Sequence, residues 1–257
     1  MAATLEILDR PNGVRVLTLF NPVRKNALDD AFFDLLEQAL RTPDGTRAIL
    51  LRSKEEGIFS SGYDLASLKS YDPSQRLPDD RLGEVLDLIT HHPAPSVAAV
   101  TGPAFGAGCE LAAACDFRVG DGRALFSMPP SRLGVVYAQK GLARLVSRVG
   151  EGHARYMFLT GRRIGAAEAL RFGLLDALAA DGAAEDAALA LCDELAASAP
   201  LALSGMKLGL SLMKRGGGTP AEAAHYEGLR RASFNSADAA EGRAAILEKR
   251  PPKFTGK

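Results

Sequence analysis

The chain of 257 residues is 47% hydrophobic and 24% charged, and its 31 Lys and Arg residues balance 31 Asp and Glu residues. This is an ordinary globular composition, and it excludes a disordered chain. The zero net charge excludes a nucleic-acid binder that depends on overall basicity. The prolines and glycines of the longest mainly apolar stretch, residues 88–109, exclude a membrane span there.

The first six residues lack the basic and apolar regions of a secretory signal, so we expect a cytoplasmic protein. Three cysteines without paired spacing, Cys109, Cys115 and Cys192, are expected to be reduced thiols in the core. The four histidines form no HxxxH pattern and accompany no carboxylate cluster, which predicts that there is no metal site.

The N-terminal part alternates strand-like and helical segments. Residues 5–10 and 14–19 flank a Pro-Asn-Gly turn and predict a β-hairpin. Asp29 can then cap a helix whose apolar residues follow helical spacing: Phe32, Leu35, Leu36, Ala39 and Leu40. Residues 48–51 and 96–100 are short apolar runs, each followed by a glycine-containing loop and a helical stretch, which predicts βαβ units.

From residue 151 onward the pattern is helical. The predicted helices are 154–159, 166–172, 183–197, 201–214, 221–233 and 237–249. We therefore predict an α/β core over residues 1–190. A helical region over residues 191–257 is expected to pack on the core or on a neighbouring subunit.

Two loops could bind a ligand through their backbone. The first is 59–65 (FSSGYDL), and the second, 102–108, opens an apolar helix that contains Glu110. The first N–H groups of a helix lack intrahelical acceptors, so an anion or a developing oxyanion would fit there. Taken alone, a glutamate at this position is more often a favourable charge on the helix dipole. The sequence has no P-loop, no GxGxxG pattern at this turn and no GxSxG elbow.

Three segments in register resemble the crotonase superfamily, the enoyl-CoA hydratase/isomerase family: 21–28 (NPVRKNAL), 59–65 and 102–111 (GPAFGAGCEL). The resemblance covers essentially the whole chain, including residues 248–254. It implies a crotonase-like (ClpP/crotonase) α/β fold, a spiral of βαβ units with a helical C-terminal trimerisation region. It also implies a homo-oligomer, either a trimer or a dimer of trimers.

The same resemblance implies an acyl-CoA substrate, or the same thioester on a carrier protein, with no metal and no cofactor beyond that coenzyme A. No nucleic-acid or membrane partner is expected. By the matching positions, the N–H groups of Tyr63 and Ala107 would form an oxyanion hole, and Glu110 would transfer protons. The Tyr63 side chain would either pack or contact a polar group of the substrate.

The resemblance also implies the residues that bind the rest of the substrate. Arg24 and Lys25 lie where family members meet the CoA phosphates, although both could be solvated surface. Asp64, Leu65 and Ala66 match the strip beneath pantetheine and adenine. The other candidate substrate-binding residues are Ala27, Ser61, Gly62, Gly106, Pro130 and, in the basic tail 249–257, Lys253. Residues 67–84 are expected to line the acyl site.

One matching position departs from the hydratases, because Pro130 stands where they carry a second carboxylate. Two carboxylates hold and split one water in those enzymes. A lone Glu110 could still shift a double bond, or could hydrate with the help of the Tyr137 phenol. Residues 128–137 resemble those of methylmalonyl-CoA decarboxylases, so decarboxylation is an alternative. A non-catalytic acyl-thioester-binding protein is another.

Overall fold

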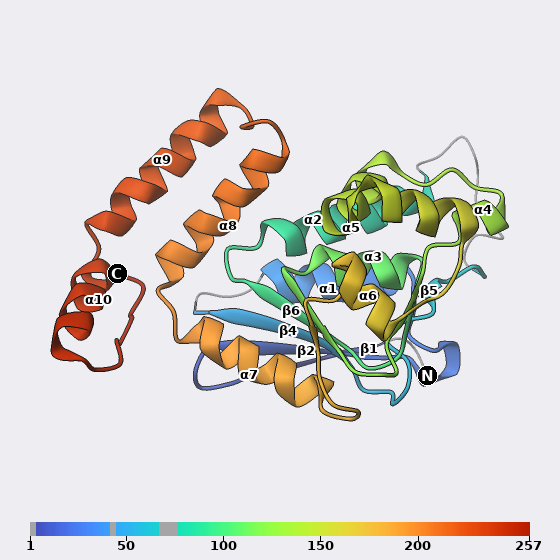
Figure 1. The fold of residues 1–257 in the computed structure, drawn as a ribbon, viewed down its shortest axis with the longest axis horizontal. Coiled ribbons are helices and arrows are strands. Elements are labelled where there is room, and N and C mark those ends of the chain that lie inside the picture. Colours follow the sequence, from blue (N-terminus) through green and yellow to red (C-terminus); the bar gives the residue numbers. More distant parts are fainter. Residues whose placement is uncertain (1–3, 42–44, 67–76) are drawn as a thin grey trace.

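The computed structural model describes residues 4–41, 45–66 and 77–257, and its centre is one twisted sheet (Figure 1). The strand order is β1-β2-β4-β6-β8-β11, and every pairing except the β1–β2 hairpin is parallel. The strands are β1 (Thr4–Asp9), β2 (Val14–Phe20), β4 (Ala48–Ser53), β6 (Ser96–Val100), β8 (Phe117–Gly120) and β11 (Ala177–Leu178). The predicted hairpin and the two predicted strands after it are confirmed.

Helices cover both faces of the sheet (Figure 1). One face carries α1 (Asp30–Arg41), α2 (Pro78–His91), α3 (Ala107–Ala114), α5 (Gln139–Thr160) and α6 (Ala166–Phe172), and α7 (Ala184–Ala196) covers the other. The α1 cap is confirmed, because the Asp29 carboxylate accepts the Phe32 N–H at 2.9 Å. Within α1, Phe33 is buried whereas Leu35 is only half-buried.

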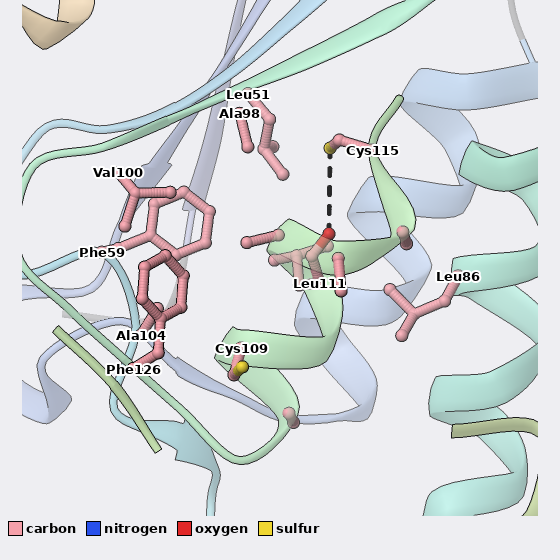
Figure 2. Close-up of a cluster of buried hydrophobic side chains, with 14 of the residues drawn as sticks. Leu51, Phe59, Leu86, Ala98, Val100, Ala104, Cys109, Leu111, Cys115 and Phe126 are labelled. Atoms are coloured by element: carbon pink, nitrogen blue, oxygen red, sulfur yellow. Dashed lines mark hydrogen bonds between the residues drawn. The ribbon is translucent and has the colours of Figure 1, made fainter. Parts of the chain in front are cut away.

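Alternate residues of each strand supply two separate cores. Leu51, Ala98 and Val100 face α3, where they pack beside Phe59 and Leu111 (Figure 2). Their neighbours along the strands face α7. This is the expected result of strand alternation in a parallel sheet buried on both faces. The three cysteines are buried and carry free thiols, as predicted.

Small strands hold the loops at one end of the sheet. β3 (Ala27–Leu28) pairs with β5 (Gly62–Tyr63), and β9 (Leu125–Ser127) lies between β7 (Pro103–Phe105) and β10 (Ile164–Gly165). The short α4 (Pro130–Leu133) follows β9.

Three helices project from the core at the end remote from α3 and α5 (Figure 1). This helical arm consists of α8 (Pro200–Lys214), α9 (Pro220–Phe234) and α10 (Ala237–Glu248). The predicted boundary at residue 190 falls inside α7, whose apolar residues pack on the sheet as far as Ala196. The helical pattern alone could not separate α7 from the arm, because helical spacing does not say which partner a helix packs against.

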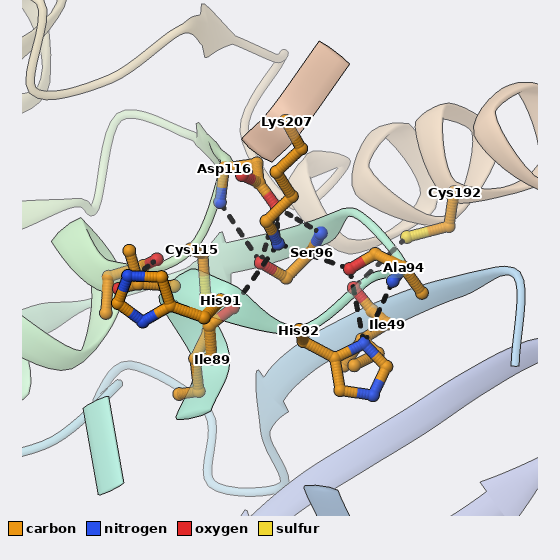
Figure 3. A network of polar contacts seen from close by, with 12 residues as sticks. Ile49, Ile89, His91, His92, Ala94, Ser96, Cys115, Asp116, Cys192 and Lys207 are labelled. Carbon is orange, nitrogen blue, oxygen red and sulfur yellow. Dashed lines mark hydrogen bonds and ion pairs between the residues drawn. The ribbon is translucent and has the colours of Figure 1, made fainter. Parts of the chain in front are cut away.

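A lysine of α8, whose side chain is 13% exposed, joins the arm to the core (Figure 3). The Lys207 Nζ of α8 donates to the Asp116 carboxylate at 2.6 Å and to the Ala94 carbonyl at 3.2 Å. Ser96 donates to the same carboxylate through its N–H and its hydroxyl. Within the described ranges no single helix is long and apolar enough to cross a membrane; α7 and α8 reach that length and composition only together, across a bend of 108°.

Candidate active site

The two loops predicted to bind a ligand lie against each other. The N–H groups of Phe59 and Ser60 both donate to the Pro103 carbonyl, at 2.9 and 3.0 Å, and the Phe105 N–H donates back to the Ser60 carbonyl at 3.0 Å. Ser60 and Ala104 form a parallel bridge. Segments 45 residues apart in the chain are thereby fixed side by side.

Close approach of these loops requires glycine at two positions. Gly62 has a φ of +102°, and a Cβ there would lie 2.6 Å from the Phe105 carbonyl oxygen and 3.7 Å from the Ala107 nitrogen. A Cβ at Gly108 would lie 2.7 Å from the Ser60 Cβ. The β5 backbone and the first turn of α3 are therefore in direct contact.

The amide groups of Tyr63 and Ala107 lie at this junction. Gly62 donates to the Ser60 hydroxyl and Asp64 to the Leu28 carbonyl, and strand geometry directs the Tyr63 N–H to the opposite side. Ala107 is the first residue of α3, so its N–H has no acceptor inside the helix. The Tyr63 ring packs beside Phe33, with the ring centroids 6.0 Å apart.

Glu110 lies one helical turn after Ala107 and is 2% exposed. Side chains of a helix lean toward its N-terminus, so the carboxylate points back toward the end that carries the Ala107 amide. One carboxylate oxygen forms an ion pair with Arg144 of α5, and the other accepts a hydrogen bond from the Tyr137 hydroxyl. Three segments thus meet at one buried carboxylate.

The surroundings of Glu110 act on its charge in opposite directions. Burial raises its pKa above the ordinary value, whereas Arg144 and the Tyr137 hydroxyl lower it. Burial and the nearby Glu110 charge raise the pKa of Tyr137 well above its ordinary value. The phenol therefore remains protonated and donates to the carboxylate.

The residues predicted to meet coenzyme A lie along the outer edge of the same loops. Arg24 forms an ion pair with Asp64, and the Ser61 hydroxyl donates to the Arg24 carbonyl at 3.0 Å. Asp64 also accepts the Ala66 N–H at 3.0 Å. Of the other residues predicted to meet coenzyme A in these loops, Lys25, Leu65 and Ala66 are exposed and Ala27 is buried.

Two predicted site residues have different surroundings. Pro130 is buried and begins α4, so the segment that carries a carboxylate in the hydratases presents an apolar ring here. Lys253 lies in the C-terminal tail, where its N–H donates to Glu241 of α10 at 2.8 Å. The helix α10 lies far from α3 (Figure 1). Of the predicted acyl-site stretch 67–84, residues 67–76 lie outside the described residues.

Sequence reasoning missed Arg144 because it predicted a helix only from residue 154, whereas α5 runs from Gln139 to Thr160 with a kink at Gly150, and Arg144 lies before that kink. Leu142, Leu145 and Val149 do follow helical spacing and could have revealed it. Three glycines in α5 obscured that signal. One of them, Gly141, leaves room for the site, since a Cβ there would lie 2.4 Å from the Tyr137 ring and 3.0 Å from Glu110.

Among the described residues no group of three or more His, Cys, Asp and Glu side chains is arranged to hold a metal ion. What the site offers is two backbone amides, a buried carboxylate and a phenol. Such groups can polarise a carbonyl and move a proton on a neighbouring carbon.

Comparison with known proteins agrees with this fold. The enoyl-CoA hydratase/isomerase family model matches residues 9–257. The chain is 35% identical over 250 residues to a Mycobacterium tuberculosis protein named probable enoyl-CoA hydratase echA6, covering 97% of this chain and 98% of that one. It is 33% identical over 267 residues to the carnitinyl-CoA dehydratase of Escherichia coli, covering 97% and 98%.

A solved structure of an enoyl-CoA hydratase from Bacillus anthracis superposes with a TM-score of 0.90 at 26% identity, covering 98% of this chain and 99% of that one. The fold is therefore the crotonase fold of the enoyl-CoA hydratases. The chain is an enzyme of the enoyl-CoA hydratase/isomerase family. The predicted resemblance is confirmed.

Proposed function

We propose that this enzyme forms the enolate of an acyl-CoA thioester and uses Glu110 to move the proton. One observation carries the proposal: a buried carboxylate lies one turn from the amide that begins α3, where that helix meets β5. In the proposed reaction the thioester oxygen accepts hydrogen bonds from the Tyr63 and Ala107 amides. Donors fixed before charge develops are worth about 3 to 4 kcal/mol of barrier each.

The proposed base is the Glu110 carboxylate. It takes a proton from the carbon that becomes nucleophilic, and the electron pair of the broken C–H bond moves into the enolate. Returning that proton to a different carbon shifts a double bond, for which one carboxylate is sufficient. Adding or removing water also requires a second polar group, and the Tyr137 hydroxyl, which donates to Glu110, is the proposed one.

The test is exchange of the α-proton of a saturated acyl-CoA in deuterium oxide, followed by mass spectrometry. Glu110→Gln should lower the exchange rate by about 10² or more, because the amide cannot accept the proton. Binding of the acyl-CoA should change little, since Glu110 is not among the residues predicted to contact coenzyme A. Binding without exchange in the unaltered protein would instead identify a thioester-binding protein.

Tyr137→Phe tests the phenol separately. Its ring packs 5.5 Å from the Phe158 ring, centroid to centroid, and phenylalanine keeps that contact. We expect hydration of an enoyl-CoA to fall by about 10², while proton exchange falls much less, because exchange needs only the carboxylate. An equal loss in both assays would show that the phenol has no specific role in hydration.

Decarboxylation of a malonyl-type thioester is the second candidate. It is favoured by the combination of Pro130 in place of an acid with a tyrosine in contact with Glu110. In this reaction the C–C bond to the carboxylate breaks, carbon dioxide leaves, and the enolate is then protonated. Mass analysis of methylmalonyl-CoA decides it, because no loss of carbon dioxide above the blank removes this candidate.

We also propose that copies of the chain assemble through the helical arm into a trimer or a dimer of trimers. The arm exposes large apolar side chains to solvent: Met206, Leu210, Met213, Phe234, Ile246 and Leu247. Exposed apolar surface of this kind is typical of an interaction site. Assembly would also give Lys253 a route to a CoA phosphate bound by a neighbouring copy.

A further inference from the structure

An ionic chain leads from the buried Glu110 to the protein surface. Arg144 contacts Glu110 with one terminal nitrogen and the Asp87 carboxylate of α2 with the other, at 2.9 Å for the second contact. The other oxygen of Asp87 accepts from Lys140 at 2.7 Å. The side chains are 3% exposed at Glu110, 8% at Arg144, 31% at Asp87 and 68% at Lys140.

The two contacts of Arg144 fix its guanidinium between two carboxylates. The group is planar, so holding one carboxylate at each terminal nitrogen sets the position of both. Lysine has a single nitrogen on a flexible stem and could not bridge them in the same geometry. A buried carboxylate with a fixed cation on one oxygen and a phenol on the other has a single orientation.

A second consequence concerns the charge of Glu110. Burial favours the protonated carboxyl, which could not act as a base, and Arg144 opposes that effect. Asp87 partly neutralises Arg144 and so limits how strongly it holds the carboxylate. The charged and titratable groups around Glu110 come from three helices and a loop. From α5 and α2 they are Arg144, Asp79 and, behind Arg144, Asp87 with Lys140. The others are Tyr137 from the loop before α5 and Cys109 from α3 itself. Two further groups lie on neighbouring strands. The Tyr63 ring of β5 packs on Phe33, and Arg118 of β8 acts on the Cys109 thiol.

We propose that Arg144 is a positioning residue, which holds the Glu110 carboxylate ionised and aimed at the substrate, and that Asp87 sets the strength of this hold. The proposal rests on the proposed function of Glu110 as the base. It assigns roles to two residues that lie outside the loops of the site and supply no atom to the substrate.

At low pH the exchange rate should fall as Glu110 becomes protonated, and this part of the pH profile is called the acid limb here. Two substitutions should shift the acid limb in opposite directions. Arg144→Gln removes both the cation and the bridge, so the limb should move to higher pH by about one to three units, and high pH should restore the rate only to a reduced plateau. Asp87→Asn leaves Arg144 uncompensated, so the limb should move to lower pH. Arg144→Lys keeps the charge but not the bridge, so the limb should stay near its original pH while the plateau rate falls.

A purely structural role for Arg144 predicts a different result. In that case each variant would lower the rate equally at every pH, and this outcome would overturn the proposal. The milder Asp87→Asn keeps the test decisive if Arg144→Gln does not fold, because a limb that stays in place or moves upward also contradicts the proposed role of Asp87.

A second readout does not depend on activity. The difference infrared spectrum between the protein and its Glu110→Gln variant isolates the carboxyl of Glu110, and its titration gives the midpoint directly. The midpoint should rise in Arg144→Gln and fall in Asp87→Asn even if the unaltered protein exchanges no proton. That combination would reject the proposed function while supporting the role of Arg144, and an unchanged midpoint in both variants would reject the role itself.

Discussion

At the scale of single residues, the central feature is a glutamate whose burial and partners oppose each other. Glu110 must be ionised to accept a proton, so the rate should fall as the pH falls through its pKa. Burial raises that pKa above 4.5, so the half-maximal rate is expected at a pH above 4.5. Because the pKa of Tyr137 is raised well above 10.0, its phenol should cause no decline up to about pH 9.

The pH profile of kcat/KM for proton exchange checks this expectation. The profile should rise once with increasing pH and then remain level. A midpoint at or below the ordinary value for a glutamate would contradict the burial argument.

The backbone at Gly62 gives a prediction about stability. Gly62→Ala forces a side chain onto a φ of +102° and places its Cβ 2.6 Å from a carbonyl oxygen. We expect the free energy of unfolding to fall by about 2 to 4 kcal/mol, as measured by urea denaturation.

Gly152→Ala in α5 is the matched control for Gly62→Ala. A Cβ at Gly152 meets nothing within 4 Å, and its φ is not in the left-handed region. Alanine there should leave the free energy of unfolding unchanged or increase it by up to about 1 kcal/mol, because alanine favours the helix. Equal losses in both variants would show that the contact between the loops is not the cause.

At the scale of elements, Lys207 links α8 to the core. Lys207→Met removes the cation that binds Asp116 and the Ala94 carbonyl (Figure 3). The half-buried Asp116 would keep the hydrogen bonds that Ser96 donates to it. We expect a loss of about 2 kcal/mol in the free energy of unfolding. Proteolysis at residues 197–199, between α7 and α8, should also be faster.

Arg231→Met on α9 is the comparison for Lys207→Met. The Arg231 side chain is 79% exposed, with only an ion pair at 3.6 Å to Glu227 on the same helix. Such surface pairs contribute little, so neither stability nor proteolysis should change measurably. Unchanged proteolysis in Lys207→Met would mean that other contacts hold α8.

At the scale of the whole molecule, the apolar surface of the arm predicts assembly. Ile246 and Leu247 are 79% and 83% exposed at the end of α10. Replacing both with aspartate would put two charges into the proposed interface, so sedimentation should show smaller species than the unaltered protein forms. Leu8→Asp on the exposed side of β1 is the control and should leave the sedimentation unchanged. Identical sedimentation of all three proteins would contradict assembly through α10.

Local patterns in the sequence were sufficient for much of the fold. The hairpin, the capped α1 and the helices from α6 onward were predicted to within a few residues, because turn residues, caps and apolar spacing are local signals. The first half of α5 was not predicted, because glycines at 141, 150 and 152 weaken its helical pattern. The pattern also could not show that α7 packs on the sheet, because helical spacing does not say which partner a helix packs against.

The sequence by itself determined the family, the two loops and Glu110, since short segments in the right order carry them. Only the tertiary structure decided what surrounds that carboxylate. Arg144 and Tyr137 reach it from 34 and 27 residues away, and Asp87 reaches Arg144 from another helix. Charge on a buried group depends on distance and burial in three dimensions, and neither is written in the spacing of residues along the chain.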